Sequence, residues 1–144
     1  MNDIQITRDF AVSPARLFEA ITTKAEVIQW WGHDGMTVPD HALDFTQTGP
    51  WHAVMIGAEG GRFHMSGQIT HVRAPASVGF TWGWQDDDGV RGAESHVTLT
   101  VTACAKGARL TIDHVDLPSP EVAARHEAGW GGPMARLDRL LSRF

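Results

Sequence analysis

Histidine is the residue type with which this chain could most readily do chemistry near neutral pH, because imidazole titrates there and also binds metals. The chain carries eight histidines, at His33, His41, His52, His64, His71, His96, His114 and His126. A helical zinc site places two histidines one turn apart, and no pair here has that spacing, since His126-Glu127 lacks the second histidine. The sequence therefore predicts no metal site, and it indicates no cofactor.

Proton transfer is the second chemistry to consider, and its candidates are His114 and Glu127. His114 lies in step with Leu110 and Ile112, so a strand at this place would point all three side chains inward. An inward imidazole is either a hydrogen-bonded core residue or a polar group that anchors a ligand, and both alternatives stay open. Glu127 could act as a general base with a raised pKa if it faced a cavity, whereas on a solvated helix face it would have no chemical role.

Nucleophilic hydrolysis and nucleotide binding find no support in the sequence. It contains no Gly-x-Ser-x-Gly motif and no glycine loop that could hold a phosphate. The segment Asp86-Asp87-Asp88-Gly89 lacks the spacing of a calcium-binding loop, so we expect a solvated hairpin tip. Cys104 is the only cysteine, which excludes an intramolecular disulfide.

Large apolar side chains are more informative than the titratable ones. The run Trp30-Trp31-Gly32 has a counterpart in Gly129-Trp130, and two adjacent indoles cannot share one narrow helical face. One indole should seal the core while the other borders a cavity or the surface, an arrangement typical of a cup for an apolar ligand. The residues expected to form its wall are Trp30, Trp31, Trp51, Met55, Met65, Phe80, Trp82, Trp130 and Met134, with His114 as the polar anchor.

The elements that must position these residues begin with a strand over 4–10, where apolar and polar residues alternate. Ser13-Pro14 predicts the start of a short helix, because serine caps a helix and proline suits its first position. A second helix is predicted from the capping-box spacing of Thr23 and Glu26, and Gly32 should end it.

From about residue 42 to 115 the apolar residues recur with a period of two, and short turns separate the runs. This pattern predicts an antiparallel meander. A final helical region is expected over about 120–143, opened by Ser119-Pro120. Gly129 and the Gly131–Pro133 run predict either a late start or break of that helix, or room beside Trp130 for a ligand.

Length and charge narrow the possible partners. The chain has 144 residues and a formal net charge of −5, which fits one domain over 1–144. Lysines and arginines are scattered, so we expect no nucleic-acid binding. The apolar runs are too short to span a bilayer and the N-terminus lacks a signal-peptide pattern, so we expect no membrane insertion and a cytoplasmic location.

The order of these elements resembles the START-like (helix-grip, SRPBCC) superfamily, and in particular its AHSA-type branch, related to the C-terminal domain of heat-shock protein 90 ATPase activators. The motifs that carry the resemblance are Phe10–Pro14, Trp30-Trp31-Gly32, Gly49-Pro50-Trp51, Ser66-Gly67, Ala74-Pro75, Phe80-Thr81-Trp82, His96-Val97-Thr98, Gly107–Thr111 and His126–Trp130. The resemblance implies an α+β helix-grip fold. In that fold a curved antiparallel sheet wraps around a long C-terminal helix, and two short helices lie between the first two strands.

The resemblance also implies a cavity between the sheet and the last helix, since members of the superfamily bind lipids, sterols, polyketides or hormones and some are cyclases or aromatases. We therefore favour a protein that binds a small apolar or aromatic molecule over an enzyme. The alternatives are a cyclase or dehydratase that uses His114 or Glu127, and a module that interacts with a chaperone and stimulates its ATPase. The sequence leaves open whether the protein is a monomer or a homodimer.

Overall fold

The structure, a computed structural model, describes residues 3–32, 35–86 and 88–142. Its elements are β1 (Ile4–Phe10), α1 (Pro14–Thr22), α2 (Lys24–Trp30), β2 (Thr37–Ala42), β3 (Gly49–Ile56), β4 (Arg62–Arg73), β5 (Ser77–Gln85), β6 (Ser95–Cys104), β7 (Gly107–Val115) and α3 (Pro120–Leu141).

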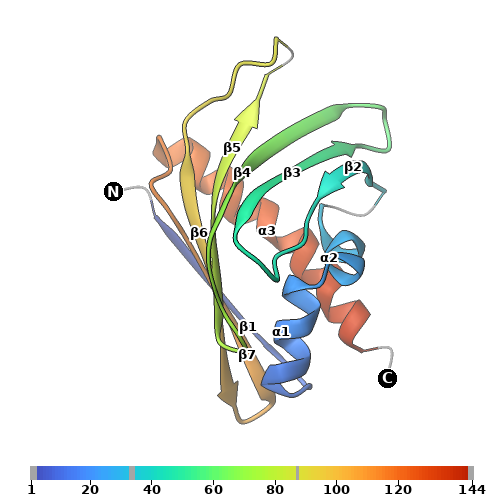
Figure 1. Cartoon of the computed structure of the whole chain (residues 1–144), viewed down its shortest axis with the longest axis vertical. Coiled ribbons are helices and arrows are strands. Elements are labelled where there is room, and N and C mark those ends of the chain that lie inside the picture. The colour runs from blue at the N-terminus through green and yellow to red at the C-terminus, as the bar shows by residue number, and fades with distance from the viewer. Residues whose placement is uncertain (1–2, 33–34, 87, 143–144) are drawn as a thin grey trace.

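The strands form one antiparallel sheet in the order β1-β7-β6-β5-β4-β3-β2. Strands β2 to β7 follow one another as a meander, and β1 joins the far edge beside β7. The sheet curves around α3, while α1 and α2 lie beside that helix (Figure 1). This is the predicted α+β helix-grip fold, with two short helices between the first two strands.

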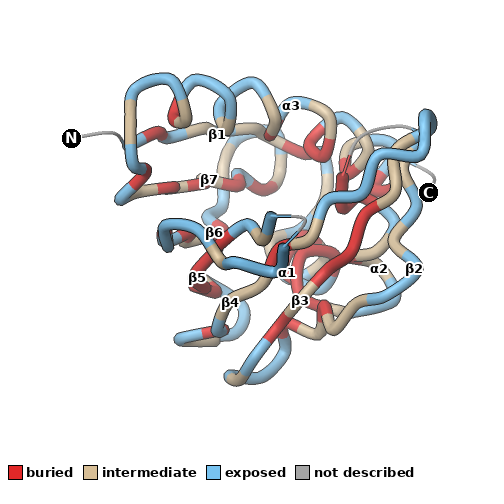
Figure 2. The backbone as a smooth tube through the Cα atoms, turned by 90° about the horizontal axis from the view of Figure 1, so that it is seen from above, coloured by how far each residue is buried: buried red, intermediate tan, exposed pale blue. Residues whose placement is uncertain are grey.

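The core lies between the concave face of the sheet and the helices. Alternate residues of β6 and β7 are buried, among them Val97, Leu99 and Ile112, as the period of two predicted. From the other side α3 buries Met134 and Leu137. In Figure 2 the buried stretches lie mainly inside the molecule, and the exposed stretches lie at the loops and the outer turns of α3.

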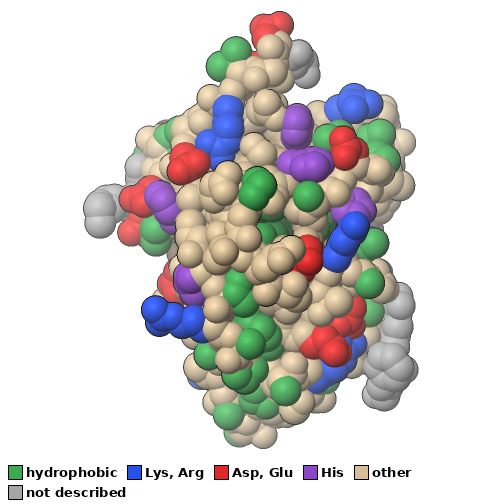
Figure 3. Space-filling view, viewed as in Figure 1, with side chains coloured by type: hydrophobic (Ala, Val, Ile, Leu, Met, Phe, Trp, Pro, Cys, Tyr) green, Lys and Arg blue, Asp and Glu red, His purple; other side chains and the backbone are tan. Residues whose placement is uncertain are grey.

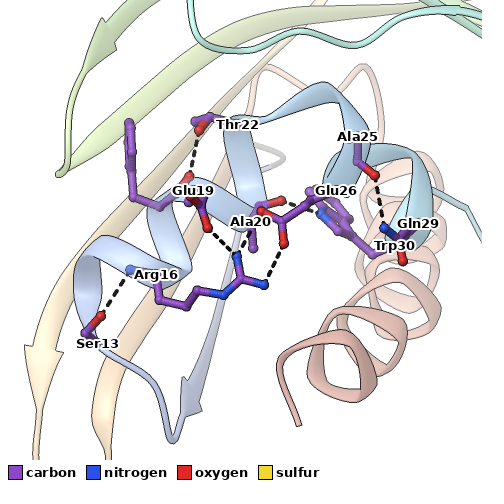
Figure 4. A network of polar contacts seen from close by, with 10 residues as sticks. Ser13, Arg16, Glu19, Ala20, Thr22, Ala25, Glu26, Gln29 and Trp30 are labelled. Atoms are coloured by element: carbon purple, nitrogen blue, oxygen red, sulfur yellow. Dashed lines mark hydrogen bonds and ion pairs between the residues drawn. The ribbon is translucent and has the colours of Figure 1, made fainter. Parts of the chain in front are cut away.

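An arginine side chain links α1 to α2 and so positions the tryptophan pair at the end of α2. Arg16 on α1 forms an ion pair with Glu26 on α2 at 2.6 Å and with Glu19 at 2.8 Å (Figure 4). The predicted cap Ser13 accepts a hydrogen bond from the Arg16 N–H. Thr23 stands at the N-cap of α2, but its side chain makes no capping bond. The predicted capping box is therefore wrong, because Glu26 is engaged by Arg16 instead.

The end of α2 sets the two indoles at different angles. The indole N–H of Trp30 donates to the carbonyl oxygen of Ala20 at 2.9 Å, which fixes Trp30 against α1 (Figure 4). Trp31 has left the helical conformation, and Gly32 follows with a φ of +84° that glycine adopts without strain. The helix ends here, as the sequence predicted, and Trp31 packs against Trp51 and Trp82 of the sheet.

Two elements differ from expectation. The edge strand β2 was not predicted, because it is mostly exposed, contains Pro39 and shows no apolar alternation. Helix α3 runs from Pro120 to Leu141 through Pro133, without the predicted late start or break. Tertiary packing explains the second difference, since Pro133 is buried against the rest of the molecule.

Candidate functional site

A cavity of about 520 Å³ lies between the sheet and α3. It is mainly apolar, and residues from both ends of the chain form it. Its lining residues are Trp30, Trp31, Gly32, Met55, Phe63, Trp82, Trp84, Gly92, Ala93, Ser95, Leu117, Pro118, Val122, Arg125, His126, Gly129, Trp130 and Pro133. Phe63 and Trp84 are exposed large hydrophobic residues, so the cavity reaches the surface beside them.

The cavity brings together part of the wall predicted from the sequence. Trp30, Trp31, Met55, Trp82 and Trp130 line it. The other predicted residues are buried in the core behind the lining: Trp51, Met65, Phe80, His114 and Met134.

Trp51 shows why a buried aromatic can miss the cavity. Its indole N–H donates to the carbonyl oxygen of Thr81 at 2.8 Å, across the intervening strand β4. Gly67 on β4 makes this possible, because a Cβ there would lie 1.9 Å from the Thr81 oxygen and 2.7 Å from the Trp51 nitrogen. Trp51 is thereby held against the sheet, behind Trp31 and Trp82.

Trp82 is the centre of the aromatic wall. Its ring stacks on Trp31, with centroids 5.3 Å apart and planes 17° apart, and it meets Trp130 edge-on at 5.9 Å. Trp84 and His126 also contact it. The Nε1–H of Trp82 is buried and has no hydrogen-bond partner among the described residues. An unsatisfied buried donor costs about 1–3 kcal/mol.

Behind this wall a chain of hydrogen bonds fixes the protonation of His114. The Trp130 indole N–H donates to His114 Nδ1 at 3.3 Å, and because an indole can only donate, Nδ1 carries no proton. The neutral ring therefore carries its proton on Nε2, which donates to Ser95 Oγ at 2.7 Å. The Ser95 hydroxyl in turn donates to the carbonyl oxygen of Trp82 at 3.4 Å.

Burial and, to a smaller extent, the neighbouring His126 together lower the pKa of His114 from 6.5 to about 3. His114 is fully buried, so its imidazole is neutral at physiological pH. Its partner Ser95 lines the cavity, which gives a serine–histidine pair that the sequence analysis missed. The parity of Ser95 with Val97 and Leu99 along β6 was the signal that could have found it.

The cavity-facing stripe of α3 carries the two remaining polar groups, Arg125 and His126. The Trp84 indole N–H donates to His126 Nε2 at 3.3 Å, so neutral His126 carries its proton on Nδ1. Burial and, secondarily, the charge of Arg125 lower the pKa of His126. Glu127 is exposed and does not line the cavity.

Sequence reasoning missed the α3 stripe although its spacing was readable. Starting from Val122, the lining residues recur after three or four positions at each turn of the helix: Arg125 and His126, then Gly129 and Trp130, then Pro133. The stripe was not predicted, because Arg125 and His126 each resemble a solvated surface residue when considered apart from the others. The loop residues Leu117 and Pro118 gave no such signal.

Among the described residues, the other histidines are not gathered into a metal site. His52 pairs with Asp40 and His96 with Asp116, both at the surface, and His71 bonds to Ser77. Over 3–32, 35–86 and 88–142 the structure holds no group of three or more His, Cys, Asp or Glu side chains placed to bind a metal. His33 lies outside the described residues, as do Asp87 of the acidic loop and Arg143.

Surface charge offers no basic tract on the face seen in Figure 3, where Lys and Arg side chains stand apart from one another among acidic ones. None of the helices described is both long and apolar enough to cross a membrane.

Comparisons with known proteins agree with this architecture. The family described as "Activator of Hsp90 ATPase homolog 1-like protein" matches residues 11–142. The crystal structure of the AHSA1 protein from Silicibacter pomeroyi is 50% identical to this chain, covers 97% of each of the two chains, and superposes with a TM-score of 0.94. No protein of curated function matches the chain.

More distant solved structures share the fold. A protein from Mycobacterium smegmatis is 22% identical with a TM-score of 0.82, and the match covers 99% of this chain and 91% of that one. A protein from Chromobacterium violaceum is 16% identical with the same TM-score, covering 97% of both chains.

Proposed function

The chain belongs to the family of Activator of Hsp90 ATPase homolog 1-like proteins, and from that premise we propose that it binds a small apolar or aromatic molecule in the cavity between its sheet and α3. The observation that carries the proposal is the cavity itself, with a volume of about 520 Å³ and a wall of indole rings. Pockets that bury small ligands span roughly 300–1,000 Å³ and are lined mainly by apolar and aromatic groups with a few polar ones.

Hydrogen bonds inside the protein hold part of the wall in place. Trp30 is tied to Ala20, and Trp130 is tied to His114, so two of the lining indoles have fixed orientations. Binding in such a site costs little side-chain entropy, because these indoles are already ordered. Each Å² of apolar surface that the ligand removes from water contributes about 25 cal/mol to binding.

Gly129 supports the proposal from the helix side. It lines the cavity, and a Cβ built on it would meet nothing within 4 Å. Glycine in a helix interior costs about 1 kcal/mol relative to alanine. Gly129 therefore lowers the stability of the helix, but it leaves space for a ligand beside Trp130.

A cavity-filling substitution tests the proposal. Gly129→Leu should extend a side chain into the cavity and abolish binding of the neutral fluorescent probe N-phenyl-1-naphthylamine, while thermal stability stays equal or rises because leucine favours the helix. The matched control is Gly131→Leu, at an exposed position of the same helix that also has open space but does not line the cavity.

Probe fluorescence and thermal unfolding would be recorded on the three proteins side by side. We expect the wild type and Gly131→Leu to bind the probe with equal affinity, and Gly129→Leu to bind at least tenfold more weakly. Equal binding by all three, or no binding by the wild type, would contradict the proposal.

The cyclase or dehydratase alternative draws no support from the polar groups around the cavity. A base that activates Ser95 would need an unprotonated Nε2, but the Trp130 N–H holds the proton of His114 on that nitrogen. The low pKa of His114 further weakens it as a base. Glu127 stands outside the cavity lining.

A chaperone-stimulating role is the second candidate, and the observation in its favour is the description of the family. Its test is the ATPase rate of a heat-shock protein 90 chaperone with and without this chain alone. A rate increase that persists in Gly129→Leu would assign that role to the outer surface. An unchanged rate would count against it.

A further inference from the structure

We infer that the molecule bound in this cavity carries a single carboxylate, held by Arg125 at the cavity wall, with its apolar body against Trp82 and Trp130. The inference rests on the proposed function, since it names the class of ligand that the same cavity takes.

Charge is the first argument. Arg125 is the only Lys, Arg, Asp or Glu among the described lining residues, and it forms no ion pair or hydrogen bond within the described chain. The acid of the nearby loop, Glu94, is already paired with Arg91 at 2.8 Å. A cation without a partner at an apolar cavity favours a ligand that brings the negative charge.

Hydrogen-bond polarity is the second argument. Two side chains that line the cavity carry N–H groups with no acceptor among the described residues: the guanidinium of Arg125 and Nδ1–H of His126. The Ser95 hydroxyl proton is used on the Trp82 carbonyl. A carboxylate is an acceptor without a donor, so it complements this set, whereas an alcohol or amine would present its own N–H or O–H to other donors.

Position along α3 is the third argument. Arg125 and His126 lie one turn before Gly129 and Trp130 on the cavity-facing stripe. A ligand whose ring occupies the space beside Gly129 therefore has its polar end within reach of Arg125 when it extends by a short chain. Arg125 is exposed, so the charged end stays next to water and escapes the cost of full burial.

The test uses a matched pair of probes, 1-naphthaleneacetate and 2-(1-naphthyl)ethanol, which share the ring and the chain length and differ in charge. Titration calorimetry at pH 7.5 would give both affinities for the wild type, Arg125→Gln and Arg73→Gln. Arg73 is exposed at the end of β4 and absent from the lining, so its variant controls for the loss of one positive charge.

We expect the wild type and Arg73→Gln to bind the carboxylate more tightly than the alcohol. In Arg125→Gln the carboxylate should lose about five- to tenfold in affinity while the alcohol is unchanged, as for a charge-assisted hydrogen bond next to solvent. Raising the salt concentration should weaken only the carboxylate.

If the alcohol binds and the carboxylate binds no better, or if both arginine variants behave alike, the carboxylate inference is wrong while the binding function stands. If neither probe binds the wild type, the proposed function fails and the inference fails with it.

Discussion

Burial keeps His114 neutral, and hydrogen bonds that all run in one direction, from Trp130 through His114 and Ser95 to the Trp82 carbonyl, fix its tautomer. This series of hydrogen bonds joins α3 to β7, β6 and β5, and it orients the Trp130 indole relative to the backbone of Trp82. The sequence predicted that His114 points inward, but it could not predict the role, because Ser95 lies on another strand and Trp130 on the helix. A positioning role for His114 follows from these partners.

The lowered pKa of His114 makes the stability of the folded protein sensitive to acid. The pKa of His114 is 6.5 in an exposed chain and about 3 in the folded protein. Between these pH values the unfolded chain binds a proton that the folded protein does not bind, so the free energy of unfolding decreases as pH falls from 6.5 toward 3. Protonation of His114 in the unfolded chain makes the free energy of unfolding about 2 kcal/mol lower at pH 5 than at pH 7.

His114→Gln isolates that contribution, because the glutamine amide can accept from Trp130 and donate to Ser95 but does not titrate. Urea unfolding at pH 7 and pH 5 should show a smaller loss of stability for the variant than for the wild type. Titrating carboxylates affect both proteins equally. An identical loss in the two proteins would show that His114 binds a proton as readily when folded as when unfolded.

Strand β4 sets how closely the neighbouring β3 and β5 side chains can approach across it. Gly67 is the critical position, since the Trp51 indole passes over it to reach the Thr81 carbonyl oxygen. The alternation of apolar residues was enough to predict β3 to β7, but it carried no information on which aromatic crosses β4 and which borders the cavity. That division depends on the curvature of the sheet, and the exposed edge strand β2 escaped the pattern altogether.

Gly67→Ala should destabilise the protein by about 2 kcal/mol or more, because the new methyl group would overlap backbone atoms of Thr81 and force β4 and β5 apart. Gly61→Ala, in the turn before β4, is the control, since a Cβ there meets only the Phe63 ring at ordinary contact distance. Thermal unfolding of both variants makes the comparison. Equal midpoints for the two would mean that Gly67 is not tightly packed.

At the scale of the whole molecule, the sheet curves around α3 (Figure 1). The cavity lies between them, and Trp30 and Trp31 at the end of α2 are among its lining residues. The element order and the resemblance sufficed to predict this architecture. The polar groups of the cavity were not predicted, although the helical spacing of Arg125 and His126 and the strand parity of Ser95 were readable, because only the fold shows that α3 and β6 line the same cavity.

The indole N–H signals in a ¹⁵N NMR spectrum test the central claim most directly. The chain has six tryptophans, and all except Trp51 line the cavity. Titration with 2-(1-naphthyl)ethanol should move the signals of the lining indoles, because the probe ring changes the surroundings of the rings that it contacts, while the Trp51 signal moves least. Signals would be assigned by single Trp→Phe variants. A spectrum unchanged at saturating probe, or a Trp51 shift as large as the others, would contradict binding in this cavity.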